Sequence, residues 1–145
     1  MPRCSRSLAL GLVAGSLALA LGGCTRVEES ASTYSPTSVE PIKGQDDIKQ
    51  VTFTAQAAQR AGLETAAVHG SGGRMSIPYA ALIYNEEGTT YTYVSRTPLI
   101  YVRTRIGVDH IADGRVVLRR GPPAGTRVVT TGAAEVYSAE FGVEE

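Results

Sequence analysis

The residues of this chain that could carry covalent or metal chemistry are two cysteines and two histidines, among 145 residues. His69 lies in a glycine-rich segment and His110 near the end of an expected strand. Neither histidine has a Cys, His or Glu partner at the spacing that zinc sites require. The sequence therefore predicts no metal site and no cofactor. Of the two cysteines, Cys24 stands at the edge of the one long hydrophobic stretch.

That stretch has the organisation of a secretory signal. Arg3 and Arg6 come first without any acidic residue, and Ser7 to Leu21 are then almost wholly Leu, Ala, Val and Gly. A short basic start before an apolar core of about 7–15 residues is typical of a signal peptide. A membrane-spanning helix needs roughly 20 apolar residues, which this run does not supply. We expect residues 1–23 to be a signal peptide.

The end of the signal carries a second pattern. Leu21-Gly22-Gly23-Cys24 resembles the bacterial lipobox, in which a Leu and two small residues precede an obligatory Cys. The resemblance implies cleavage just before Cys24 and a diacylglycerol on its sulfur; the alternative is an ordinary signal with a chance cysteine. Cys4 would leave with the signal, so the mature chain would have no free thiol and no disulfide. The expected location is the cell membrane, lipid-anchored on the extracytoplasmic face (the periplasmic side if Gram-negative).

Charge and composition divide the remaining chain. Loss of Arg3 and Arg6 would leave two more acidic than basic residues, which gives no indication of nucleic-acid binding. Thr25 to about Gln45 is rich in Ser, Thr, Glu and Pro, the composition of a solvated linker. We therefore expect a flexible linker over residues 24–47 and one small domain over residues 48–145.

The periodicity of this domain is mostly that of strands. In the first part we expect a strand at 48–53, a helix at 55–61 capped by Thr54 and stopped at Gly62, a strand at 63–68 and a flexible break at 69–74. In the second part we expect strands at 79–84, 89–94, 100–109, 115–120 and 127–131, and a short helix at 133–141. Asp113-Gly114 is a hairpin signal. The predicted fold class is mainly β, a small antiparallel β-roll or barrel with one or two short helices.

No catalytic constellation accompanies these elements. Asp109 and His110 with Ser95 could suggest a triad, but the sequence supplies neither a nucleophile turn nor oxyanion donors. We therefore expect that the protein is not an enzyme.

A binding surface is predicted instead on the strand that begins at residue 100. Alternation along this strand places Tyr101, Arg103 and Arg105 on one face, which we expect to be exposed. Tyr and Arg are enriched in protein interfaces, and the hypothesis is that these three residues contact a partner. The alternative is that tyrosines occur here because aromatic residues suit strands.

Two portions of the chain, the second of them in two stretches, resemble the periplasmic adaptor (membrane-fusion) subunits of RND-type efflux pumps. "VTFTAQAAQRAGLETAAV" is similar to the segment that opens the adaptor's membrane-proximal domain. "IPYAALIYNEEGTTYTYV" and "VVLRRGPPAGTRVVTTGAAEVYSAEFGV" are similar to its closing portion. Full adaptors carry lipoyl-like, β-barrel and usually helical-hairpin modules between these portions, whereas this chain has only residues 69–74 there.

The resemblance implies a lipid-anchored accessory protein of an efflux system that acts by binding and positioning. The implied partner is an inner-membrane transporter, of RND type. The rival hypothesis is a free-standing lipoprotein that binds a small solute or a cell-wall fragment in a Tyr-lined cleft. An apolar pocket of roughly 300 Å³ or more with convergent polar groups would favour this rival.

The resemblance also makes a prediction about topology. In full adaptors the opening and closing portions form one domain, so residues 48–68 should pair in one sheet with strands around residues 115–131. Six extended residues span up to about 20 Å, which is enough for the break at 69–74 to bridge the two portions. The alternative is that residues 48–68 form a detached stub and the C-terminal half folds alone.

Overall fold

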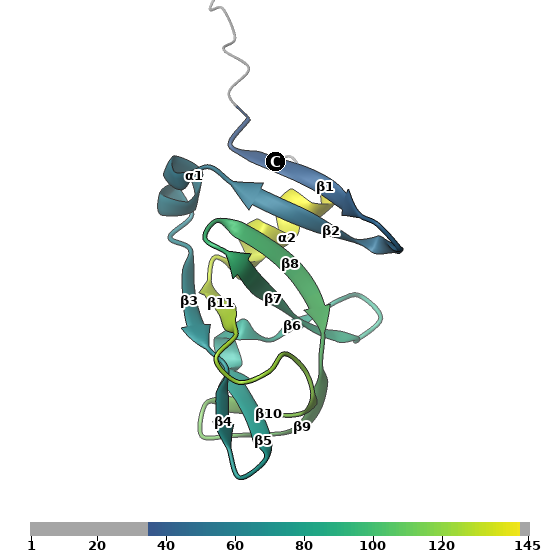
Figure 1. Cartoon of the computed structure of the whole chain (residues 1–145), viewed down its shortest axis with the longest axis vertical. Coiled ribbons are helices and arrows are strands. Elements are labelled where there is room, and N and C mark those ends of the chain that lie inside the picture. The colour runs from purple at the N-terminus through teal and green to yellow at the C-terminus, as the bar shows by residue number, and fades with distance from the viewer. Residues whose placement is uncertain (1–34, 143–145) are drawn as a thin grey trace, which may run out of the picture. The chain divides into compact units, whose positions relative to one another are not determined.

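The computed structural model describes residues 35–142 of the chain (Figure 1). The predicted signal peptide, Cys24 and the first part of the predicted linker lie outside the described residues. Within the described part, neither α-helix has the length and hydrophobicity that crossing a membrane would require.

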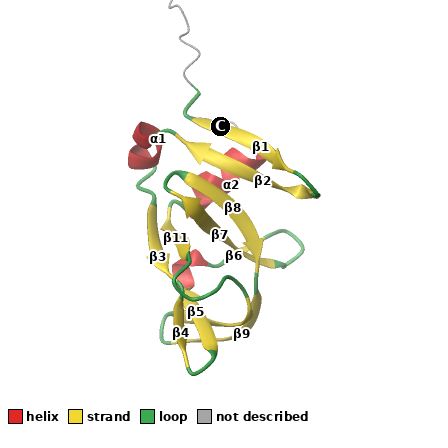
Figure 2. Cartoon of the chain, viewed as in Figure 1, coloured by secondary structure: helices red, strands yellow, loops and turns green. Residues whose placement is uncertain are grey.

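The larger sheet contains seven antiparallel strands. Its order is β1 (Thr37–Ile42), β2 (Gln45–Phe53), β8 (Ile100–Arg105), β7 (Thr90–Thr97), β11 (Arg127–Thr131) and β3 (Glu64–Ala67), with β6 (Ile83–Tyr84) also on β7. The smaller sheet is antiparallel too and has the order β4 (His69–Ser71), β5 (Arg74–Pro78), β10 (Arg115–Arg120) and β9 (Gly107–Ala112). Two short α-helices, α1 (Ala55–Arg60) and α2 (Ala133–Phe141), and a 3₁₀ turn, η1 (Tyr79–Ala81), complete the fold (Figure 2). The protein is thus mainly β, as predicted, and the described strands do not close into a barrel.

Pairing between distant segments confirms the predicted topology. β3 pairs with β11 in a register that sets Ala66 opposite Val128. β2 pairs with β8, with Val51 opposite Tyr101. The hypothesis of a detached N-terminal stub is therefore wrong, and the first and last parts of the domain share one sheet.

Local signals explain where the helices begin and end. The Thr54 side chain accepts a hydrogen bond from the Ala57 N–H, which caps α1, and Gly62 follows the helix with a positive φ of 60°. Gly132 precedes α2 with φ 79° and lies against Leu63, close enough that an added Cβ would come within 2.1 Å of the leucine Cδ2. Glycine is needed there on both counts.

The interior has two apolar clusters on opposite faces of the larger sheet. One lies between that sheet and the two helices and consists of Val51, Phe53, Ala57, Ala58, Tyr93, Tyr101, Val129 and Val136. The other involves both sheets and η1 and consists of Val68, Ile77, Ala81, Ile106, Val116, Leu118 and Val128. β7 and β11 contribute to both clusters, because successive side chains of a strand point to opposite faces.

Four expectations about the elements need correction. The strand expected from residue 100 is two strands, because β8 ends at Arg105 in the larger sheet and β9 begins at Gly107 in the smaller sheet. Residues 69–74 are not a flexible break: they belong to the hairpin β4–β5, whose turn residues Gly72 and Gly73 both have positive φ. Residues 79–84 are not one strand, because η1 follows Pro78, whose φ of −56° suits a turn, and only Ile83–Tyr84 pairs with β7.

The predicted linker also contains regular structure. β1 and the first residues of β2 fall within residues 24–47, and β1 pairs along β2 as far as Phe53, with Val39 opposite Val51. β1 is an edge strand with mostly exposed side chains and with Pro41 in it. Proline and polar residues are typical of edge strands, so composition alone made this segment resemble a linker.

Candidate functional site

The three residues of the predicted partner surface share one face of β8, but residues of α2 pack against that face. Tyr101 and Arg103 are only 5% and 6% exposed, whereas Arg105 at the end of the strand is exposed. The alternation of faces along β8 was therefore predicted correctly, but the exposure of Tyr101 and Arg103 was predicted wrongly. The reason is that α2 packs on this face and brings the carboxylate of Glu140 to Arg103. Neither contact can be read from the pattern of the strand.

Arg103 is held by an acid from α2. Its Nε lies 3.1 Å from Oε2 and 3.2 Å from Oε1 of Glu140, whose side chain is 1% exposed. The Nη2 of Arg103 donates to the main-chain oxygen of Asp47 at 2.6 Å. Buried charges are stable only when they are paired and hydrogen-bonded, and this pair meets that condition.

Further donors converge on Glu140. The Tyr93 hydroxyl donates to its Oε2 at 2.5 Å, and the Lys49 N–H donates to its Oε1 at 3.3 Å. Burial, together with the hydrogen bond and negative charge of Glu140, raises the pKa of the Tyr93 phenol above its usual value of about 10. The Nζ of Lys49 donates to the main-chain oxygen of Glu140 at 3.4 Å, near the C-terminus of α2, where cations are favourable.

Two aromatic rings also contact the guanidinium of Arg103. Its Cζ lies 4.7 Å from the ring centroid of Tyr91 and 5.0 Å from that of Phe141. Phe141 in turn packs on Tyr137, with ring centroids 4.5 Å apart. These distances are those of cation–π contacts, so Arg103 is fixed from β2, β7 and α2 together.

The arrangement is therefore a clamp that docks α2 onto the sheet; we call Tyr93, Arg103 and Glu140 the α2 clamp. Sequence reasoning missed Glu140, although one signal was available. Val136 and Glu140 are four residues apart and so lie on the same helix face, and Val136 is fully buried. An acid on a buried helix face indicates a basic partner in the core.

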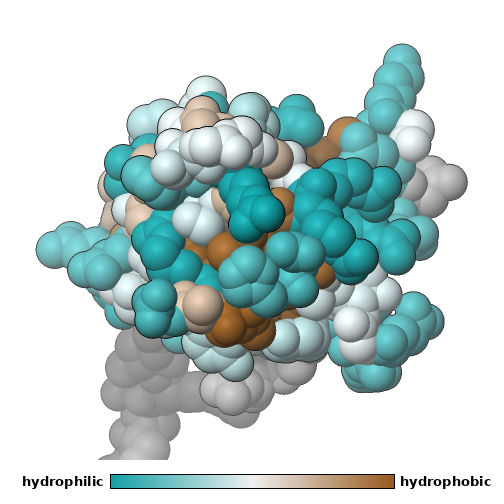
Figure 3. Space-filling view, turned by 90° about the horizontal axis from the view of Figure 1, so that it is seen from below, coloured by the Kyte–Doolittle hydropathy of each residue, from teal (hydrophilic) through white to brown (hydrophobic). Residues whose placement is uncertain are grey.

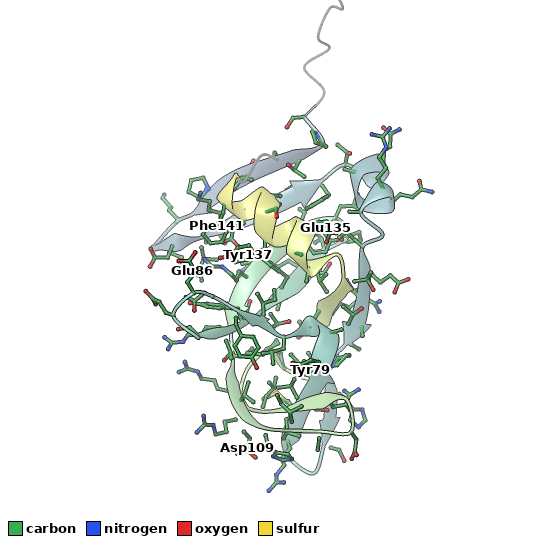
Figure 4. The ribbon with its side chains drawn as sticks, turned by 180° about the vertical axis from the view of Figure 1, so that it is seen from behind. Tyr79, Glu86, Asp109, Glu135, Tyr137 and Phe141 are labelled. Atoms are coloured by element: carbon green, nitrogen blue, oxygen red, sulfur yellow. The ribbon has the colours of Figure 1, made fainter. Side chains whose placement is uncertain are left out.

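Two surface depressions lie beside the clamp. One, of about 800 Å³, contains the residues Asp47, Ile48, Lys49, Asn85, Glu86, Glu87, Tyr91, Arg103, Arg105, Tyr137 and Phe141. The other is a more apolar groove of about 440 Å³ between β6 and α2, lined by Leu82, Ile83, Tyr84, Ala133, Ala134, Tyr137 and Ser138. Both are open to solvent. Tyr137, Phe141 and Glu86 lie on the same side of the molecule (Figure 4).

The smaller sheet forms the end of the domain that lies away from the α2 clamp, and its surface includes exposed hydrophobic residues. Hydrophobic residues form a patch there within hydrophilic surroundings (Figure 3). Ile111 on β9 is 48% exposed, and Val117 on β10 is half-buried.

The residues that could suggest catalysis are only partly brought together, because His69 and His110 line one shallow depression of about 190 Å³ on the smaller sheet whereas Ser95 does not line it. His69 and His110 lie on the two edge strands of the smaller sheet, one opposite Ser76 and the other opposite Val117. The Nδ1 of His110 lies 3.0 Å from Oδ2 of its neighbour Asp109 on the surface. Ser95 lies in the larger sheet, and its hydroxyl donates to the Thr97 carbonyl oxygen. Among residues 35–142 no group of three His, Cys, Asp or Glu side chains is placed to hold a metal ion.

Comparisons with protein-family models, with curated proteins and with solved structures found no match.

Proposed function

We propose that this protein is a lipid-anchored accessory subunit of a membrane efflux system of RND type, which acts by binding and positioning. Cys24 would hold it on the extracytoplasmic face of the membrane, and the β-rich domain would contact an inner-membrane transporter. Transport energy would come from that transporter.

The observation that carries the proposal is the pairing of β3 with β11. It is the topology expected if the two adaptor-like portions of the sequence form one membrane-proximal domain. The only structure at the point where full adaptors carry their other modules is the hairpin β4–β5. The fold class and this contact support the proposal, which otherwise rests on the sequence.

The arrangement of the folded unit is compatible with an anchored subunit. The described chain enters at β1, at one end of this unit, and the β4–β5 hairpin lies at the other end (Figure 1). Within the described residues, the smaller sheet therefore lies at the end opposite the point where the chain enters β1 (Figure 1).

The rival, a lipoprotein that binds a small solute, has one observation in its favour. The groove between β6 and α2 exceeds 300 Å³ and includes two tyrosines, Tyr84 and Tyr137. It is open to solvent, however, whereas small-molecule sites bury most of the ligand surface. Tyr84 is 52% exposed and Phe141 45%, and aromatic residues of this kind are enriched where proteins meet. We therefore retain the adaptor proposal.

Photo-crosslinking in cells tests it directly. A photoreactive amino acid replaces Tyr84, Phe141 or Arg105 in turn, and Arg60 on α1 serves as an exposed control position on a different element. The expected result is a covalent product with a multi-span RND-type transporter from at least one of the first three positions and none from Arg60. The product should be identified by mass spectrometry of both chains.

A functional measurement runs in parallel. Deletion of the gene should raise the cellular accumulation of a fluorescent efflux substrate, and the wild-type chain should restore export whereas the Cys24→Ala chain should not. Unchanged accumulation in the deletion strain together with no transporter crosslink would refute the proposal. A retained small molecule in the purified protein would support the rival.

A further inference from the structure

Three arginines converge on one surface depression at the junction of the two sheets. Arg105 is the last residue of β8, and Arg119 and Arg120 end β10. All three side chains are exposed and line the same open depression of about 450 Å³. Gly107 lies opposite Arg120 where β8 passes into β9, so the two sheets bring these positions together. We call Arg105, Arg119 and Arg120 the arginine cluster.

The positive charges of this cluster are not neutralised within the fold. The ion pairs of the described residues join Arg103 to Glu140 and His110 to Asp109, and none involves the cluster. Arg119 uses its Nε to donate to the Val108 carbonyl oxygen at 3.0 Å, which orients its guanidinium and leaves both terminal nitrogens for another acceptor. The one acid that lines the depression is Glu87.

We propose that the arginine cluster is a binding site for a phosphate group. The planar guanidinium pairs with phosphate oxygens through two parallel hydrogen bonds, and three guanidinium groups suit a multiply charged oxyanion. Mutual repulsion of the three charges falls when such a group binds. The phosphate belongs either to an anionic phospholipid headgroup or to a soluble phosphate compound. The lipid source rests on the proposed function, whereas the site itself does not.

The position of Glu87 allows binding at this site to be distinguished from a general effect of surface charge. Its carboxylate lines the depression and opposes an anion there. Glu87→Gln should therefore strengthen phosphate binding, while Glu86→Gln, one residue away in the same loop and outside this depression, should change it less. Replacing each arginine of the cluster with Gln should weaken binding about fivefold. Arg60→Gln on α1 removes the same charge at a distant position and serves as the matched control.

The test uses the full chain in neutral detergent micelles and follows the arginine Nε–H signals by NMR. In one arm inorganic phosphate or pyrophosphate is added at constant ionic strength, with chloride as reference. In the second arm the micelles are doped with phosphatidylglycerol, with phosphatidylcholine as reference. In a third arm a short poly-glutamate peptide is added. Each arm is repeated with Arg119→Gln, Glu87→Gln and Arg60→Gln.

Saturable shifts of the cluster signals, lost in Arg119→Gln and retained in Arg60→Gln, support the proposal. Shifts with phosphatidylglycerol alone identify a lipid headgroup, and shifts with inorganic phosphate or pyrophosphate alone identify a soluble compound. Absence of shifts in both phosphate arms overturns the proposal. So does tighter binding of poly-glutamate than of phosphate, which would identify an acidic protein surface as the ligand. These outcomes do not depend on transporter crosslinking, so failure of either proposal can be recognised separately.

Discussion

Arg103 on β8 and Glu140 on α2 form an ion pair in the protein interior, with Nε and Oε2 3.1 Å apart and side chains 6% and 1% exposed. The two residues are 37 positions apart in the chain. The pair joins the last helix to the middle of the larger sheet, next to the strands β2 and β7 that supply its other partners.

Glu140→Gln should destabilise the protein by about 3–5 kcal/mol, because it leaves the Arg103 charge buried without its partner. Urea denaturation followed by circular dichroism measures the change. Glu135→Gln, on the exposed side of the same helix, should stay within about 0.5 kcal/mol of the wild type. The double variant Arg103→Met/Glu140→Met should be more stable than Glu140→Gln, because it contains no unpaired charge. Equal stability of Glu140→Gln and Glu135→Gln would contradict this account of the α2 clamp.

The Tyr93 phenol should make stability fall at alkaline pH. Its pKa is raised in the folded protein by burial and by Glu140, so the folded state retains a proton that the unfolded chain loses above about pH 10. This contribution is complete below pH 10 and decreases as the pH rises further. The unfolding midpoint measured between pH 8 and 12 should fall less steeply for Tyr93→Phe than for the wild type. Tyr84→Phe, at an exposed tyrosine, provides the control, and it should leave the steepness unchanged.

Gly132→Ala should destabilise the protein for two separable reasons. A left-handed backbone costs an L-residue roughly 1–2 kcal/mol, and the new Cβ would lie 2.1 Å from Cδ2 of Leu63 and 3.1 Å from the Ala61 oxygen. Gly125 has a similar φ of 85° with nothing within 4 Å of an added Cβ, so Gly125→Ala measures the backbone cost alone. The expected excess for Gly132→Ala is about 1–3 kcal/mol. Indistinguishable denaturation midpoints for the two variants would show that Leu63 moves away freely.

Cys24→Ala should release the protein from the membrane or leave its signal uncleaved, because one sulfur atom carries the whole predicted lipid attachment. Membrane fractionation with mass spectrometry of the N-terminus measures both outcomes. Cys4→Ala is the matched control and should retain wild-type membrane association. Wild-type recovery of a cleaved Cys24→Ala chain in the membrane fraction would show that the domain is held there by other contacts.

Strands bounded by specific turn residues were predictable from the sequence. β10, β11 and α2 have the predicted bounds, since Asp113-Gly114 and Gly132 take positive φ where the chain must reverse or change direction. The pairing of β3 with β11 was predictable only through the resemblance, because strand periodicity gives the face of a residue and not the identity of its neighbour.

The α2 clamp could not be predicted in the same way. Alternation along β8 separates Tyr101, Arg103 and Arg105 from Val102, but both sets are largely buried at this point of the sheet. Which face a helix covers depends on the path of the chain after β11. The interaction that decides it, between Arg103 and Glu140, is a contact between elements distant in sequence. The arginine cluster is similar, because it arises where the chain passes from β8 in the larger sheet to β9 in the smaller sheet.

The pairing of β3 with β11 has a consequence for how the molecule is made. A chain that emerges from the ribosome, N-terminus first, presents β2 and β3 well before β8 and β11 exist to cover them. Contacts so distant in sequence form slowly, because the entropy of closing a long loop is lost before any strand pairing stabilises the contact. Until residue 131 has emerged from the ribosome, the edges of the early strands can pair with other chains. A chaperone or rapid export therefore matters most between the synthesis of β3 and that of β11. A stalled or truncated product that ends before β11 would lack the strand that joins β3 to the rest of the larger sheet.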